Sequence, residues 1–269
     1  ETEIQFVDRI VGNLEDLIIA EDPSTIAAFI AEPITGASGV IVPPDGYYEG
    51  IQNVLDKYGI MFWADEVITG FGRTGNDFGC TTMEIKSPDM MTFAKQLSSA
   101  YMPISASAIR RDVYEAMIDQ SASAGAFGHG YTYSGHPVAC AVALRVLEIY
   151  DRDEIFDRAS TTGKYLQEQL SQFSSHPLVG EVRGSGLLAA LELVPNKEFN
   201  HQFKDGKVGG VAQKMAQDNG LLIRTVAGSS IGICPPLIIT NNQIDELIDK
   251  LGDALDKTFQ YCQTYNLLT

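Results

Sequence analysis

Two side chains with complementary chemistry, Asp65 and Lys95, each follow an apolar run that is typical of a buried strand. The run Ile60 to Ala64 precedes Asp65, and the run Met90 to Ala94 precedes Lys95. The two groups can therefore be neighbours at one edge of a parallel sheet. They can form a structural ion pair there. Alternatively, a desolvated lysine can condense with a carbonyl group, because burial lowers the pKa of its amine from about 10.4.

A glycine-rich stretch, Gly70 to Gly75, follows the first of these strands and matches the G-x-G-x-x-G pattern of dinucleotide-binding loops. The next residues, 76–88, have no helical period and so offer no helix N-terminus to a pyrophosphate. The carboxylates of Asp65 and Glu66 would also repel that anion. We therefore interpret these glycines, like the stretch Gly184 to Gly186, as turn formers.

The elements that must position Asp65 and Lys95 alternate between strand-like and helical sequence. An apolar run predicts a strand over residues 26–32, and the spacing of Tyr48, Ile51 and Leu55 predicts a helix that Gly59 ends. Residues 104–109 supply a further strand. This alternation predicts an α/β fold with a mostly parallel sheet.

The character of the sequence changes after Pro137. Residues 138–150 are apolar nearly all round, which predicts a buried helix that leads out of a first domain. Further helices are predicted over 155–173 and 208–218 and after the capping box that starts at Thr240, with strands over 187–193, 221–224 and 231–233. We therefore predict two domains, a large α/β domain over residues 1–150 and a smaller α+β domain over residues 151–269.

Composition excludes several classes of partner. The formal net charge of −16 repels phosphate backbones and anionic membrane surfaces, so we expect neither nucleic-acid nor membrane binding. No apolar run approaches the roughly 20 residues that span a bilayer, and the chain starts without a signal-peptide pattern. The four cysteines form no CxxC pair and the four histidines no HExxH pattern. We expect a cytoplasmic protein without a metal site.

Four motifs follow one another along the chain. They are Ala31-Glu32-Pro33-Ile34 with Gly36 and Gly39, the stretch Trp63 to Gly75, Thr92-Phe93-Ala94-Lys95, and Tyr131 to Pro137. In order and spacing they resemble the class III aminotransferases. These are pyridoxal-phosphate (PLP) enzymes of fold type I that include the ω-amino acid:pyruvate transaminases. The resemblance favours Schiff-base chemistry over an ion pair at Asp65 and Lys95. The N-terminal half of the family, with its phosphate turn, has no counterpart in these residues.

The resemblance implies a task for each residue that matches a motif. Lys95 would hold PLP as a Schiff base, and its freed amine would move the proton of the amino donor. Asp65 would face the pyridine nitrogen of PLP, and Val67, two residues on and expected on the same strand face, would pack against the ring. Thr132 would bind the PLP phosphate of the neighbouring subunit, which implies a homodimer. Glu32 would support the site from a strand end.

Arg224 resembles, in position, the mobile arginine with which ω-transaminases bind a substrate carboxylate. A structural salt bridge is the alternative role for this side chain. Ornithine and 4-aminobutyrate transaminases carry a glutamate where this chain has Ala37. The resemblance therefore disfavours those two substrates and favours the pyruvate-dependent branch.

The implied reaction moves an amino group from an amine or ω-amino acid, through pyridoxamine phosphate, to an α-keto acid such as pyruvate in a ping-pong mechanism. The expected partners are thus small amines, amino acids and keto acids. Two alternatives stay open. One is an aminomutase or decarboxylase-like relative that shares Asp65 and Lys95, and the other is a catalytically silent binding protein built on the same fold.

Overall fold

The computed structural model describes residues 1–198, 203 and 206–268 of the chain. The chain forms two compact units. Unit 1 comprises residues 1–33, 43–71 and 78–153, and unit 2 comprises residues 34–42, 72–77 and 154–269. Unit 2 thus includes two short segments that interrupt unit 1 in the sequence. The assignment of residues 1–150 and 151–269 to the two domains of a family member stays a prediction.

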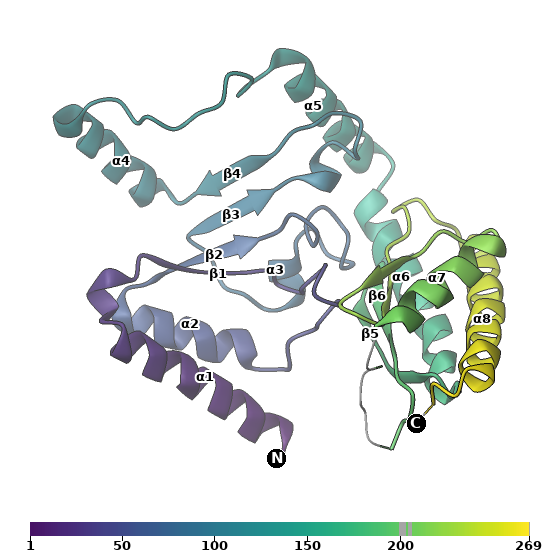
Figure 1. Ribbon diagram of the computed structural model, residues 1–269. Coiled ribbons are helices and arrows are strands. Elements are labelled where there is room, and N and C mark those ends of the chain that lie inside the picture. Colours follow the sequence, from purple (N-terminus) through teal and green to yellow (C-terminus); the bar gives the residue numbers. More distant parts are fainter. Residues whose placement is uncertain (199–202, 204–205, 269) are drawn as a thin grey trace. The chain divides into compact units, whose positions relative to one another are not determined.

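Unit 1 is built on a four-stranded sheet with the strand order β1-β2-β3-β4 (Figure 1). The strands are β1 (Ala28–Ala31), β2 (Met61–Asp65), β3 (Met90–Phe93) and β4 (Ala106–Ile109). The helices are α1 (Glu3–Ala20), η1 (Pro23–Thr25), α2 (Tyr47–Tyr58), α3 (Gly79–Thr82), η2 (Lys95–Leu97), α4 (Arg111–Ala124) and α5 (Pro137–Arg152). β2 pairs in parallel with β1 and β3, whereas β4 runs antiparallel to β3. The predicted mostly parallel sheet is confirmed.

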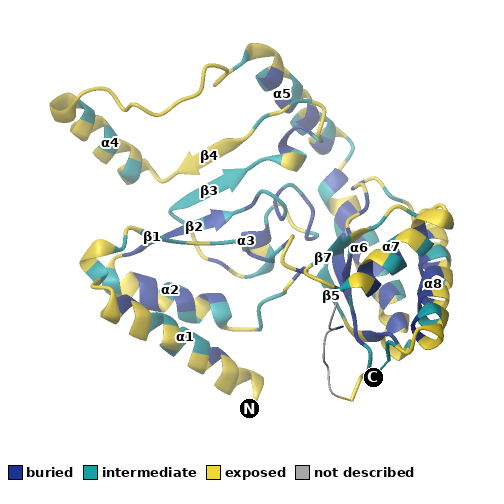
Figure 2. Ribbon diagram, viewed as in Figure 1, coloured by how far each residue is buried: buried dark blue, intermediate teal, exposed yellow. Residues whose placement is uncertain are grey.

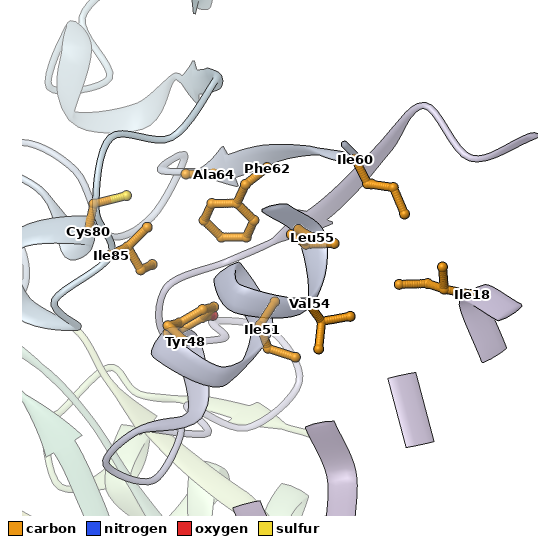
Figure 3. Close-up of a cluster of buried hydrophobic side chains, with 10 residues drawn as sticks. All are labelled: Ile18, Tyr48, Ile51, Val54, Leu55, Ile60, Phe62, Ala64, Cys80 and Ile85. Carbon is orange, nitrogen blue, oxygen red and sulfur yellow. The ribbon is translucent and has the colours of Figure 1, made fainter. Parts of the chain in front are cut away.

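Helix α2 covers one face of this sheet, and α1 packs against α2. The α2 side chains Tyr48, Ile51 and Leu55 are buried at the predicted helical spacing, and Gly59 ends α2 with a left-handed φ of 67°. They pack with Phe62 of β2 in the hydrophobic cluster shown in Figure 3. Truncation of a side chain as buried as Ile51 typically costs about 2–5 kcal/mol. This cluster therefore anchors the strands that carry the candidate site.

The other end of unit 1 is open to solvent. All four residues of β4 are exposed, and α4 has no buried residue among those described (Figure 2). The helix predicted over 138–150 is present as α5, but the prediction that it is buried holds for one side only. α5 buries Ala143 and Tyr150, but Val138 is 55% and Leu144 is 63% exposed. An apolar sequence does not specify which face of a helix is covered.

Unit 2 contains an antiparallel sheet with the strand order β5-β6-β8-β7. It also contains three long helices, which are labelled in Figure 1. The strands are β5 (Val179–Ser185), β6 (Leu188–Leu193), β7 (Arg224–Val226) and β8 (Ser230–Ile233). The helices are α6 (Ile155–Ser171), η3 (Gln172–Ser175), α7 (Lys207–Asp218) and α8 (Asn241–Thr264). Thr240 and Gln243 form the predicted capping box of α8. Within the described part of the chain, no helix is long and apolar enough to cross a membrane.

Strand β5 was absent from the sequence interpretation, which placed a turn at Gly184 to Gly186. Gly184 and Ser185 instead lie in β5, and Gly186 and Leu187 form the turn into β6. Gly186 has a φ of 58°, and a Cβ built on it would lie 2.3 Å from the carbonyl carbon of Thr74. This turn therefore requires glycine for both its backbone conformation and its close packing.

Two arginines attach the early segments of unit 2 to its sheet. Arg73, of segment 72–77, is 6% exposed and donates to the carbonyl oxygens of Leu187, at 3.0 Å, and Pro235, at 2.6 Å. Arg183 of β5 donates from Nε to the carbonyl oxygen of Gly39, at 2.9 Å, in segment 34–42. Buried carbonyl groups need such partners, so these bonds fix both segments in unit 2.

The glycine-rich stretch 70–75 forms turns, as the sequence interpretation held. Gly72 and Gly75 have φ values of 87° and 91°, and the N–H of Gly75 donates to the carbonyl oxygen of Gly72 at 3.1 Å. The four-residue helix α3 begins only at Gly79. The stretch therefore does not lead directly into a helix N-terminus of the kind that binds a pyrophosphate.

Candidate active site

Three sequence-predicted residues lie at the carboxyl ends of neighbouring parallel strands. Glu32 directly follows β1, Asp65 ends β2, and Lys95 stands two residues beyond β3. Asp65 is in register with Thr92 of β3. Open α/β sheets bind their ligands at this edge, so the carboxylate and the amine both lie at the end of the sheet where a ligand is expected.

Asp65 lies on the face of β2 that points away from the hydrophobic cluster. Along the strand, Phe62 and Ala64 are buried, whereas Asp65 is half-buried. Its Oδ1 atom accepts the backbone N–H of Val67 at 3.0 Å. Val67 itself lies in a turn, so the prediction that it shares a strand face with Asp65 is wrong. The strand ends at Asp65, and the bond from Val67 instead orients the carboxylate.

Glu66, the next residue, is buried and does not present its carboxylate to a ligand. It is 1% exposed and accepts three hydrogen bonds, from Thr69 Oγ1 at 2.5 Å and from the backbone N–H groups of Gly79 and Cys80 at 2.9 and 2.7 Å. These bonds tie the turn after Asp65 to α3. Burial, together with the Glu66 charge, raises the pKa of the Cys80 thiol, so this cysteine stays protonated.

Lys95 begins the short helix η2 with a left-handed φ of 34°. Phe93, two residues earlier, packs against Phe71 and Phe78 with ring centroids 5.6 Å apart in each pair, which fixes the end of β3. Among the ion pairs of the described residues, none joins Asp65 to Lys95. The structure therefore does not contain the structural ion pair that the sequence left open.

Glu32 contributes through its backbone in the structure. Its carbonyl oxygen accepts the hydroxyl of Tyr48 at 2.6 Å, which ties the end of β1 to α2. A second bond runs from the indole Nε1 of Trp63 to Thr92 Oγ1 at 2.6 Å and ties β2 to β3 two residues before Asp65. Sequence reasoning quoted Trp63 and Thr92 within its motifs but gave neither a task.

The two other predicted residues lie apart from this strand edge in the sequence and are exposed. Thr132 belongs to the segment between α4 and α5, in which every residue from 125 to 135 is exposed (Figure 2). Arg224, in unit 2, begins β7 opposite Gly232 of β8. In the described part of the chain, no ion pair or side-chain hydrogen bond engages its guanidinium, so the structural salt bridge considered for Arg224 is not observed.

A protein-family comparison identifies the chain's relatives. The family described as Aminotransferase class-III matches residues 1–255. The chain is 49% identical over 259 residues to the mitochondrial gamma aminobutyrate transaminase 1 of Solanum lycopersicum, with 96% of this chain and 50% of that protein covered. It is 44% identical to the vanillin aminotransferase of Capsicum chinense, with 96% and 56% covered. The chain thus spans about half the length of the curated relatives that it matches.

Solved structures agree with this result. An ω-transaminase from Pseudomonas jessenii in complex with PMP has a TM-score of 0.94 at 47% identity, with 97% of this chain and 57% of that chain covered. A transaminase with L-Ala gives the same TM-score at 46% identity, with 97% and 61% covered. The predicted fold is therefore confirmed over nearly all of these residues.

Proposed function

Because the chain belongs to the class-III aminotransferases, we propose that the full-length protein uses PLP to transfer an amino group from an amine or ω-amino acid to an α-keto acid such as pyruvate. The observation that carries this proposal is the placement of Asp65 and Lys95 at the carboxyl ends of adjacent parallel strands, with no ion pair between them. The donor ends as an aldehyde or ketone and pyruvate ends as alanine. The electron pair released at the donor carbon in the first half-reaction returns to the acceptor carbon in the second.

The residues present fit PLP. When bound, PLP supplies an aldehyde carbon for an amine and a ring that accepts an electron pair. The Lys95 amine is the group that can bond to that carbon, and when displaced by the donor it can take the donor's α-proton and return it. The Asp65 carboxylate, oriented by the Val67 N–H, favours a protonated ring nitrogen. Val67 follows Asp65 closely enough to pack beside the same ring.

The donor is tested by half-reactions on the full-length, PLP-loaded protein. Ala37 stands where 4-aminobutyrate transaminases carry a glutamate, which disfavours 4-aminobutyrate as the donor, yet a relative is named for this substrate. We propose simple amines and ω-amino acids as donors and pyruvate as acceptor. Chromatography should show PLP converted to pyridoxamine phosphate by such donors, and alanine formed when pyruvate follows. Isomerised amino acids would indicate an aminomutase, and released CO2 would indicate a decarboxylase. If borohydride fixes PLP on none of the lysines, the result would favour the alternative of a catalytically silent binding protein.

Arg224 is proposed to bind the carboxylate of pyruvate. Its guanidinium matches a planar carboxylate and is not engaged by another described residue. Arg224→Ala should weaken the binding of pyruvate by about 2–5 kcal/mol, because a desolvated carboxylate would lose its partner. The reaction of donors without a carboxylate should be unchanged. The control is Arg111→Ala, since Arg111 is an exposed arginine of α4. Equal losses with pyruvate and with a simple amine would make Arg224 structural.

A homodimer is proposed in which Thr132 donates its hydroxyl to the PLP phosphate of the neighbouring subunit. The exposure of Thr132 supports a contact outside its own chain. In mixed dimers of Lys95→Ala and Thr132→Ala subunits, the only subunit with a PLP-binding lysine receives an intact Thr132 from its partner. Those dimers should bind PLP as tightly as the wild type. Binding as weak as in Thr132→Ala homodimers would place the threonine in its own subunit's site.

The proposed location is the cytoplasm, which follows from the sequence analysis. Several relatives are named as mitochondrial or chloroplastic proteins, which makes this proposal a specific one to test. Immunodetection of the full-length protein in fractionated cells should find it with cytoplasmic markers. Enrichment in an organelle fraction would overturn the proposal.

A further inference from the structure

The backbone around Lys95 is held in conformations that non-glycine residues rarely adopt. Lys95, Ser99 and Ala100 have φ values of 34°, 47° and 63°. Each of these values lies in the left-handed region, where the Cβ atom approaches the following carbonyl oxygen. Three such residues within six positions need support from their surroundings in order to persist.

Local hydrogen bonds supply part of that support. The N–H of Leu97 donates to the carbonyl oxygen of Ala94 at 2.8 Å, and Ser98 Oγ donates to the carbonyl oxygen of Met102 at 2.7 Å. Both bonds lie within the segment 94–102, so they close its turns. They do not attach the segment to another element.

Tyr150, near the end of α5, makes that attachment. Tyr150 is buried, with 7% of its surface exposed. Its hydroxyl donates to the carbonyl oxygen of Gln96 at 2.8 Å and lies 2.6 Å from Ser99 Oγ. A phenol hydroxyl can donate one hydrogen bond, and the Gln96 carbonyl oxygen accepts it. Ser99 is therefore the donor to Tyr150, and the three groups form one directed chain of hydrogen bonds.

The helix that carries Tyr150 is itself fixed. Ala139, Ala143 and Val146, on the same side of α5 as Tyr150, are buried. α5 also contacts η2, the short helix that Lys95 begins. The phenol is thus a firm anchor for the residue next to Lys95 and for one of the strained residues beyond it.

We propose that Tyr150 is a positioning residue for Lys95. By holding the Gln96 carbonyl and Ser99, it keeps Lys95 in its left-handed conformation and so sets the direction in which the amine leaves the backbone. Without the phenol hydroxyl, the segment can relax toward ordinary φ values, and the amine then spends less time where it can bond to PLP. This inference rests on the proposed function.

The test compares three variants of the full-length protein, each studied loaded with PLP and, for the rate of PLP binding, after PLP has been removed and added back. Tyr150→Phe removes the anchor and Ser99→Ala removes one of its two partners. Tyr58→Phe is the matched control, because the Tyr58 hydroxyl donates to Glu15 Oε1 at 2.9 Å between α2 and α1. The measurements are amide hydrogen exchange of the peptide that covers 94–102, the rate at which PLP is bound and fixed by borohydride on Lys95, kcat, KM and the melting temperature.

Tyr150→Phe should raise exchange in 94–102, slow the fixation of PLP on Lys95 and lower kcat, each by about 3- to 10-fold, the effect of one lost hydrogen-bond chain. KM should change little. Ser99→Ala should shift the same quantities by less, and Tyr58→Phe should shift none of them. The inference is overturned if Tyr150→Phe matches Tyr58→Phe in exchange or in fixation rate. If borohydride labels another lysine in the wild type, the proposed function and this inference both fail.

Discussion

Strand β4 of unit 1 and strand β6 of unit 2 pair with their neighbours in the same antiparallel manner, yet their surroundings differ. All four residues of β4 are exposed, whereas five of the six residues of β6 are buried. In unit 2, β6 and the neighbouring β8 are largely buried. Unit 1 encloses one face of β2 and leaves Asp65 half-buried and Lys95 exposed at the strand ends. We therefore expect substitutions in the candidate site to alter chemistry, and substitutions in unit 2 to alter stability.

The largest expected effect is that of Lys95→Ala in the full-length protein. Without the amine, PLP has no attachment point and the donor proton has no acceptor, so turnover should fall below detection. The melting temperature should stay close to that of the wild type, because Lys95 makes no ion pair with a described residue. A turnover assay together with mass spectrometry after borohydride treatment tests the first half of this prediction, and a thermal melt tests the second. Retained turnover with label on another lysine would contradict it.

Asp65→Ala should slow proton abstraction by about 10²–10⁴-fold while PLP still binds. The carboxylate that favours the protonated ring nitrogen is lost, but the lysine attachment remains. Stopped-flow absorbance of the first half-reaction gives the rate, and the fraction of PLP retained after dialysis gives binding. Asp65→Asn is a matched variant that keeps the shape and removes the charge. Near-normal rates in Asp65→Ala would show that this residue is structural.

In unit 2, Gly186→Ala should lower the free energy of unfolding by about 2–5 kcal/mol, from the left-handed φ and from overpacking against Thr74. Gly210→Ala, on the exposed side of α7, is the control. A Cβ there has no atom of the described chain within 4 Å, so the change should be neutral or stabilising by up to about 1 kcal/mol. Urea unfolding measures both. Similar stabilities for the two variants would contradict the tight packing of this turn.

The smallest expected effect concerns the pH dependence of unit 2. Burial lowers the pKa of His176 below 6.5, more than the Asp256 carboxylate at 3.4 Å raises it. Its Nδ1 atom accepts the N–H of Leu178 at 3.2 Å, which suits the neutral ring. The folded protein thus binds fewer protons than the unfolded chain, and stability falls as the pH drops below 6.5.

Unfolding in urea between pH 7.5 and pH 5 measures this contribution. The wild type should lose more stability over that range than His176→Gln, which cannot titrate at this position. Parallel losses in the two proteins would show that His176 does not contribute.

The sequence predicted the part of the site that depends on local patterns. Two apolar runs, each followed by a polar residue, identified Asp65 and Lys95, because a buried parallel strand is apolar along its length and polar at its end. The role of Glu66 was hidden, since its partners Gly79 and Cys80 lie 13 and 14 residues away. The contact of Tyr150 with Gln96 spans 54 residues and has no local signal.

Strand β5 escaped prediction for a related reason. It contains glycine and charged residues in place of an alternating apolar pattern, and its pairing with β6 decides its structure. The side on which α5 is buried likewise depends on what packs against it. Patterns in the sequence thus identify elements and chemistry, while the partners of each face are set by contacts between distant parts of the chain.

The segments 34–42 and 72–77 have a consequence for how the protein is made. They leave the ribosome well before their partners, because Gly39 bonds to Arg183 across 144 residues and Arg73 to Pro235 across 162 residues. Closing such long loops is slow and costs entropy. Unit 2 therefore cannot be completed until the chain has been synthesised beyond Pro235. A chain cut near residue 150 would separate these segments from the sheet they join, so residues 151–269 expressed alone would begin folding without two of their own pieces.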